Sequence, residues 1–126
     1  MLLYPPEGYV WPKPWEAIAV ESRCLEFPQV MGEVFGGYEA APSLPAELQR
    51  ECCPDHPLHG RLCVAVAQAS DDPNEFVFVT DNPKLPIAFV HLTWTVERSP
   101  TFPYTVGYPS WQEFRVAWTG DGAEAM

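Results

Sequence analysis

Fifteen prolines are spread along the 126 residues of the chain, and they limit its architecture more than any other feature. Average proline usage is roughly 5%, so this chain carries more than twice the usual share. Proline removes a backbone N–H and fixes φ, and the residue before it avoids helical geometry. Because the prolines are dispersed, they predict short elements joined by stiff loops and exclude long helices.

The clearest pattern lies in the centre of the chain, where three apolar runs are separated by two short turns. Residues 61–69, 75–80 and 87–96 are rich in β-branched and aromatic side chains, which predicts strands. The intervening segments SDDPN and DNPKLP hold residues that favour turns. This order predicts an antiparallel meander. Neither face of the third strand is plainly polar, so we expect cover, at least in part, on both faces of the sheet.

Helices are predicted on both sides of the meander, over residues 14–25, 43–53 and 110–118. Ser110 and Glu113 have the spacing of a capping box, in which the Ser hydroxyl accepts the Glu N–H and the carboxylate reaches back to the Ser N–H. Residues 27–42 fit either a strand or a short helix, and a loop is expected over 97–109.

The predicted fold class is therefore α+β, a three- to four-stranded antiparallel meander sheet flanked by two or three helices. The length fits one domain. We expect that domain to span residues 1–118, with an extended arm rich in proline and aromatics at 1–14 and a flexible tail at 119–126.

Residues 51–63, ECCPDHPLHGRLC, gather three cysteines and two histidines, which are zinc-ligand types. The spacing is poor for a standard site, because paired C-x-x-C arms are missing and adjacent cysteines do not easily point at one ion. The weak metal candidates are Cys53, His56 and His59. The alternative is a helix end and a turn into a strand, with buried cysteines and with Gly60 at positive φ. We expect no metal and no cofactor.

His91 lies within a strand and has two interpretations. As a functional residue it would line a cleft with Thr93 and His56 as a general base or ligand. As a structural residue it would be a core histidine, hydrogen-bonded to backbone or to a carboxylate, which is common for a half-buried imidazole.

No nucleophile elbow, phosphate loop, dinucleotide fingerprint or zinc-protease motif is present in the sequence. Cys52 and Cys53 are expected near a helix C-terminus, where the helix dipole disfavours a thiolate. We therefore assign no catalytic residue. Aromatic side chains are the remaining candidates, and Trp94, Tyr104 and Tyr108 are predicted to contribute to a protein-binding surface, since Trp and Tyr dominate interface hot spots.

The net charge of −10 excludes several partners. Nucleic acids and anionic membranes bind clustered cations, and this chain has only seven Lys and Arg. The N-terminus lacks the basic segment of a signal peptide, and no apolar run has the length of a membrane span. We expect a cytoplasmic protein with reduced cysteines, whose partner is a basic protein or a second copy of the chain.

Three motifs occur in residues 55–115: HPLHG, VHLTW and YPSWQEF. With them the chain resembles a group of small, uncharacterised bacterial proteins that have an H-P-L-x-G turn, a V-H-L-T-W strand and a Y-x-S-x-x-E-F/W helix start. The resemblance implies a bacterial cytosolic source and an α+β domain, and it lends no catalytic residue. The small size and acidic character are also similar to those of toxin-immunity proteins.

Two functions follow as hypotheses. The first is a non-enzymatic, immunity-like domain that presents an acidic and aromatic surface to a basic partner protein. The alternative is a small metal-dependent or histidine-based enzyme, which requires the rings of His56, His59 and His91 to converge around an open pocket.

Overall fold

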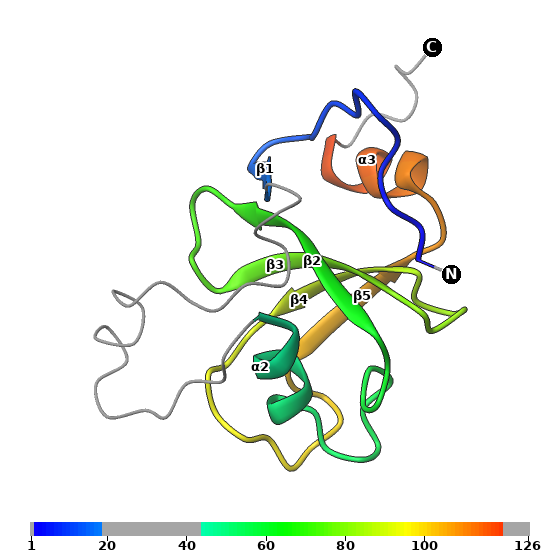
Figure 1. Ribbon diagram of the computed structural model, residues 1–126. Helices are drawn as coiled ribbons and strands as arrows, with labels where there is room; N and C mark the ends of the chain where they lie inside the picture. The colour runs from blue at the N-terminus through cyan, green and yellow to red at the C-terminus, as the bar shows by residue number, and fades with distance from the viewer. Residues whose placement is uncertain (1, 19–43, 120–126) are drawn as a thin grey trace.

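The computed structural model describes residues 2–18 and 44–119 (Figure 1). One antiparallel sheet contains five strands in chain order, β1 (Trp15–Ala17), β2 (Cys63–Ala69), β3 (Glu75–Thr80), β4 (Ile87–His91) and β5 (Tyr104–Tyr108). The described part also holds two helices, α2 (Leu44–Glu51) and α3 (Trp111–Thr119). The α+β class is confirmed, but the sheet has five strands rather than three or four.

The two helices lie on opposite faces of the sheet, and each covers its own apolar core (Figure 1). Leu48 of α2 packs with Phe76 and Phe78 on one face. Phe114 of α3 packs with Val77 and with other strand residues on the other face. The expectation that the sheet is covered on both faces is confirmed, and it explains why β3 and β4 carry apolar residues on both of their faces.

A bulge in β2 determines how its small residues are shared between the two cores. Ala65 pairs with Phe78 and Ala67 with Val77, so β2 carries one extra residue at this point. Before the bulge, Cys63 and Ala65 lie in the core below α2, where small side chains let the helix approach closely. After it, Ala67 joins the core below α3.

The N-terminal arm packs on α3 and belongs to the same core. Trp111 Nε1 donates to Leu3 O at 2.8 Å, and Tyr9 OH donates to Trp111 O at 3.1 Å. The Trp11 ring meets that of Trp111 edge to face, with centroids 5.2 Å apart. Figure 1 shows the arm running along this helix.

The predicted helix over residues 14–25 is wrong where it can be compared, because Trp15–Ala17 is strand β1 and pairs with β2. The Trp15 ring inserts between Phe89 and Phe114, with centroids 5.8 and 6.0 Å away. This long-range packing outweighs local helix propensity. Residues 19–25 of that prediction, and the segment 27–42, lie outside the described residues.

The third predicted strand ends five residues early, at His91 rather than Val96. The chain turns away beyond Leu92, and Trp94 adopts a left-handed backbone with φ of 58°. Inside the segment expected to be a loop, Tyr104–Tyr108 forms β5 and pairs with β4. The helix predicted over 43–53 is confirmed as α2, and the one over 110–118 as α3.

None of the described helices has the length and apolar character needed to cross a membrane.

Candidate functional site

His56 is a structural residue whose two ring nitrogens are both engaged. Nδ1 accepts the Leu58 N–H at 3.0 Å and lies 3.4 Å from Cys52 Sγ. Since Nδ1 accepts, the ring proton is on Nε2, which donates to Pro103 O at 3.0 Å. Burial lowers the pKa of His56 below its ordinary value. His56 is thus a neutral ring that ties the turn before β2 to the loop before β5.

The Cys52 thiol beside His56 is not an activated nucleophile. Burial raises the pKa of Cys52 to about 12, and that of Cys63 likewise to about 12. A neutral imidazole that already accepts an N–H supplies no positive charge to favour a thiolate. The arrangement gives a hydrogen-bonded buried thiol.

The segment before β2 has the predicted turn structure. Leu58 is completely buried, and Gly60 has a positive φ of 73°. His59 Nδ1 donates to Cys52 O at 3.2 Å. Among the described residues, Cys53, His56 and His59 do not bring three ligand atoms to one point. The interpretation as a helix end and a turn with buried cysteines is confirmed.

Two glutamates on α2 form a buried carboxyl pair that the sequence analysis missed. Glu47 and Glu51 are both inaccessible to solvent, and their side chains hydrogen-bond to each other. Burial, followed by this bond, raises the pKa of Glu51 to about 9. The signal was available, because residues four apart share a helix face and Leu48 marks the buried face.

The Glu51 carboxyl binds the backbone where the chain leaves β4. Oε1 accepts the Thr93 N–H at 2.8 Å, and Oε2 accepts the Trp94 N–H at 2.7 Å. The Trp94 ring is buried, and its Nε1 donates to Asn74 Oδ1 at 2.7 Å. Thr93 and Trp94 were predicted binding residues, and both are engaged within the fold.

His91 lies with carboxylates rather than with the other histidines. Its Nδ1 is 3.3 Å from Glu75 Oε2, and Asp72 is next to them. Alternation along β4 places His91 on the α3 face with Phe89, whereas His56 packs on the α2 face through Thr105. The three histidines therefore do not converge on one pocket.

The predicted aromatic residues have different environments. Trp94 is in the core, whereas Tyr104 is 53% exposed at the start of β5. Tyr108, at the other end of β5, is half-buried and packs its ring 5.2 Å from that of Phe114. Tyr104 and Tyr108 thus mark the two ends of an edge strand.

The hydrogen-bond ladder shows which residues of β4 bond to β5. Leu92 N donates to Asn74 O, and Thr80 N donates to Pro86 O. Even-numbered residues of β4 and its flanks therefore bond to β3. Because hydrogen-bonded pairs alternate along an antiparallel ladder, the odd-numbered residues of β4 bond to β5.

The outer edge of β5 is open. Through the register, the odd-numbered residues of β4 bond to Tyr104, Val106 and Tyr108. The N–H and C=O groups of Thr105 and Gly107 consequently point away from the sheet. Within the described part of the chain, these backbone groups have no hydrogen-bond partner.

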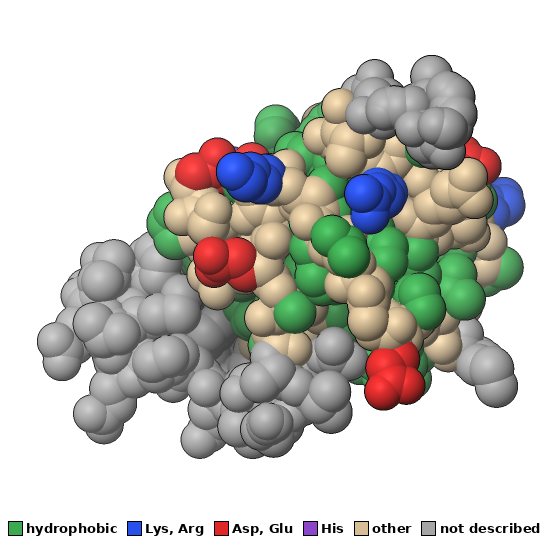
Figure 2. Space-filling model, turned by 90° about the horizontal axis from the view of Figure 1, so that it is seen from above, with side chains coloured by type: hydrophobic (Ala, Val, Ile, Leu, Met, Phe, Trp, Pro, Cys, Tyr) green, Lys and Arg blue, Asp and Glu red, His purple; other side chains and the backbone are tan. Residues whose placement is uncertain are grey.

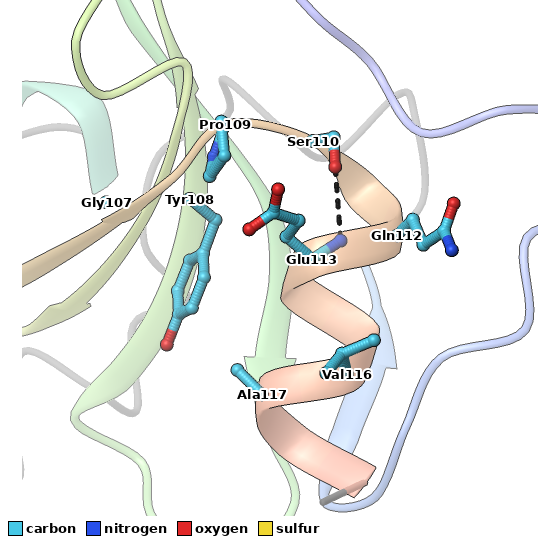
Figure 3. A pocket seen from close by; sticks show the side chains of 8 residues that line it. All are labelled: Gly107, Tyr108, Pro109, Ser110, Gln112, Glu113, Val116 and Ala117. Carbon is cyan, nitrogen blue, oxygen red and sulfur yellow. Dashed lines mark hydrogen bonds between the residues drawn. The ribbon is translucent and has the colours of Figure 1, made fainter. Parts of the chain in front are cut away.

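A hollow of about 650 Å³ lies between the C-terminal end of β5 and the outer side of α3 (Figure 3). Ser110 caps α3 by accepting the Glu113 N–H at 3.1 Å, which confirms one half of the predicted capping box. The reciprocal bond from the Glu113 carboxylate is not formed. In Figure 3 this carboxylate points toward Tyr108 and Pro109 instead. The lining residues are Gly107, Tyr108, Pro109, Ser110, Gln112, Glu113, Val116 and Ala117.

The surface around α3 is mixed rather than uniformly acidic. Figure 2 shows apolar side chains between separate acidic and basic ones on this side of the molecule. Part of the acidic excess belongs to segments outside the described ranges, namely Glu21, Glu26, Glu33, Glu39, Asp121 and Glu124.

Comparison with known proteins gives no relative, since no family model, curated protein or solved structure matches the chain significantly. The resemblance to small bacterial proteins remains a prediction.

Proposed function

We propose that this chain is a non-enzymatic protein-binding domain that adds an extended, basic segment of a partner protein to the open edge of β5. The observation that carries the proposal is the outward-pointing N–H and C=O groups of Thr105 and Gly107. Strand addition of this kind uses main-chain hydrogen bonds for affinity and neighbouring pockets for specificity.

The composition of β5 supports the proposal. Natural edge strands are usually protected by charged residues, prolines, bulges or short length. Tyr104–Tyr108 contains none of the first three, and it is five residues long. The opposite edge, β1, is three residues long and carries Glu16 at its centre. The contrast favours β5 as the edge that binds a partner.

The hollow beside β5 supports a basic partner. Among the described residues, Glu113 is the only charged one that lines it. Its carboxylate makes no hydrogen bond or ion pair with the rest of the described chain. A Lys or Arg on the added strand would supply the missing countercharge. The net charge of −10 further favours encounter with a basic protein.

An immunity-like role in a bacterial cytosol belongs to this proposal. It rests on the acidic composition and on the resemblance described above rather than on geometry. The histidine-based enzyme lacks support, because His56 is sealed in the core and His91 lies on the other face of the sheet.

A displayed library of random linear peptides, selected on the immobilised protein at low salt, tests the proposal. We expect enriched peptides to carry Lys or Arg and to bind one per chain. The substitution Thr105→Pro removes an outward N–H to which the added strand would bond, so it should abolish binding. The domain should still fold, because proline is tolerated at edge positions whose N–H faces solvent. Thr105→Val is the matched control, because it removes the same hydroxyl and keeps the N–H.

Equal binding by Thr105→Pro and Thr105→Val would contradict edge addition. Glu113→Gln should weaken the same peptides and reduce their salt dependence. The alternative occupant of this edge is a second copy of the chain, and light scattering on the free protein measures whether it forms a dimer. A dimer that Thr105→Pro converts to a monomer would show that a second copy occupies the edge.

A further inference from the structure

We propose that Asp72, Glu75 and His91 bind a divalent transition-metal ion at the turn between β2 and β3. Each residue offers a ligand atom, and the three atoms lie within 4.8 Å of one another. The cluster lies on the sheet face that α3 covers, where β3 begins and β4 ends. It uses none of the residues that line the hollow beside β5. The proposal is therefore independent of the function proposed above.

The sheet register brings two of the ligands together. Glu75 on β3 is directly opposite His91 on β4. Their neighbours Asn74 and Leu92 form a hydrogen-bonded pair, so Glu75 and His91 form the closer, non-hydrogen-bonded kind. The ring nitrogen Nδ1 of His91 is 3.3 Å from Glu75 Oε2.

The third ligand is held by the turn itself. Asp72 Oδ1 accepts the Asn74 N–H at 2.9 Å, and the Asp72 carbonyl accepts the Glu75 N–H at 3.3 Å. The buried Trp94 indole holds the side chain of Asn74, because its N–H donates to the Asn74 side-chain oxygen at 2.7 Å. One Asp72 oxygen thus organises the turn, while the other is left for a ligand.

The charge of the cluster favours a cation. Within the described part of the chain, neither Asp72 nor Glu75 forms an ion pair with Lys or Arg. Two carboxylates held close together repel each other, and a bound cation removes that repulsion. The side chains of His91 and Glu75 are 38% and 23% exposed, so an ion can reach them from solvent.

The donor set selects the class of ion. Imidazole suits Zn, Cu, Fe and Ni, and the two carboxylates also suit Mn²⁺, whereas Ca²⁺ and Mg²⁺ prefer oxygen ligands alone. Three protein ligands leave at least one position for water, as in open zinc sites. A first-row divalent ion with one imidazole, two carboxylates and water fits these residues.

Manganese titration followed by NMR of the histidine rings tests the assignment. Chelator-treated protein would be titrated with MnCl₂, and the resonances of the three histidines assigned with His91→Gln and His59→Gln. We expect paramagnetic broadening of His91 before that of His56 and His59. Calorimetry should give one Mn²⁺ per chain, and Asn74→Ala should weaken binding about tenfold or more by loosening the turn.

The matched pair is Asp72→Asn against Asp71→Asn, which remove one charge each from adjacent positions. Asn at 72 keeps the oxygen that accepts the Asn74 N–H, so the turn should fold. Binding should be lost in Asp72→Asn and His91→Gln and kept in Asp71→Asn. A Co²⁺ spectrum without thiolate charge-transfer bands would exclude cysteine ligands. Binding kept in both of the first two variants, or no saturable binding in the native protein, would overturn the proposal.

Discussion

Glu51 and Trp94 are joined across the molecule by a 2.7 Å hydrogen bond from the Trp94 N–H to Glu51 Oε2. Trp94 has φ of 58°, a left-handed conformation that costs a residue with a side chain about 1–3 kcal/mol. Glu51 also accepts the N–H and the hydroxyl of Thr93. One carboxyl group on α2 thus satisfies the strained backbone where the chain leaves β4.

Replacement of Glu51 by Ala should destabilise the protein by about 3 kcal/mol. It leaves the buried Trp94 N–H and the Thr93 N–H without an acceptor, and each unsatisfied buried group costs about 1–3 kcal/mol. Urea unfolding, followed by tryptophan fluorescence, measures the loss. Glu113→Ala, on the exposed side of α3, is the control and should change stability little. Equal midpoints for the two variants would show that Glu51 does not support this backbone.

The Glu47–Glu51 pair should make stability fall as pH rises. Burial and the Glu47 hydrogen bond raise the pKa of Glu51 from 4.5 to about 9. Between these values the folded protein binds more protons than the unfolded chain, so the folded state loses stability with increasing pH. The slope should approach about 1.4 kcal/mol per pH unit.

Between about pH 7 and pH 8 this pair should dominate the slope, because unfolded histidine titrates mainly below that window and unfolded thiols mainly above it. Glu47→Gln should flatten the slope, since its amide donates to the Glu51 carboxylate without a shared proton. An unchanged slope in Glu47→Gln would show that burial alone, and not Glu47, raises the pKa of Glu51.

Gly107→Ala should destabilise the protein by about 1–2 kcal/mol, because the added Cβ overlaps Leu85 Cδ2 and the Leu85 side chain must move. A double-mutant cycle with Leu85→Ala tests the cause. The two substitutions together should cost clearly less than the sum of the single effects. Additive costs would place the strain in the β5 backbone instead.

Cys52 and Cys63 should resist thiol reagents until the protein unfolds. Their pKa values of about 12, against an ordinary 9.0, leave roughly a thousandfold less thiolate at neutral pH. Mass spectrometry after iodoacetamide treatment, in a Cys24→Ser background, would report the modified positions. The same sample in urea is the control. Rapid labelling of Cys52 in the native protein would contradict the buried thiol–imidazole arrangement.

The central strands were predictable because their signal is local. Residues 75–80 form β3 over the predicted range, and α2 and α3 lie within a residue or two of their predicted ends. β1 was missed because its pairing partner is distant: it pairs with β2 some fifty residues later. β5 was missed although it pairs with the preceding strand β4, because the surrounding prolines favour a loop. Their stability comes from that pairing and not from their own composition.

The site residues were harder to predict, because function depends on which face a side chain occupies. Sequence spacing grouped His56 with His59 and drew attention to His91, yet the sheet separates His56 from His91. The sequence places Asp72 in a predicted turn, and only the register of β3 with β4 brings this turn and Glu75 to His91. If β4 were shifted by two residues along β3, His91 would no longer lie opposite Glu75.

The unequal lengths of the two edge strands limit how many partner strands the described sheet can bind. A strand that docks on β5 covers the long edge, and the three residues of β1 give no comparable site at the other side of the described sheet. The described part of the sheet therefore offers one site for an added strand per chain. If the added strand came from a second copy, two-fold pairing would close the complex at two chains and leave no long edge from which a fibre could grow.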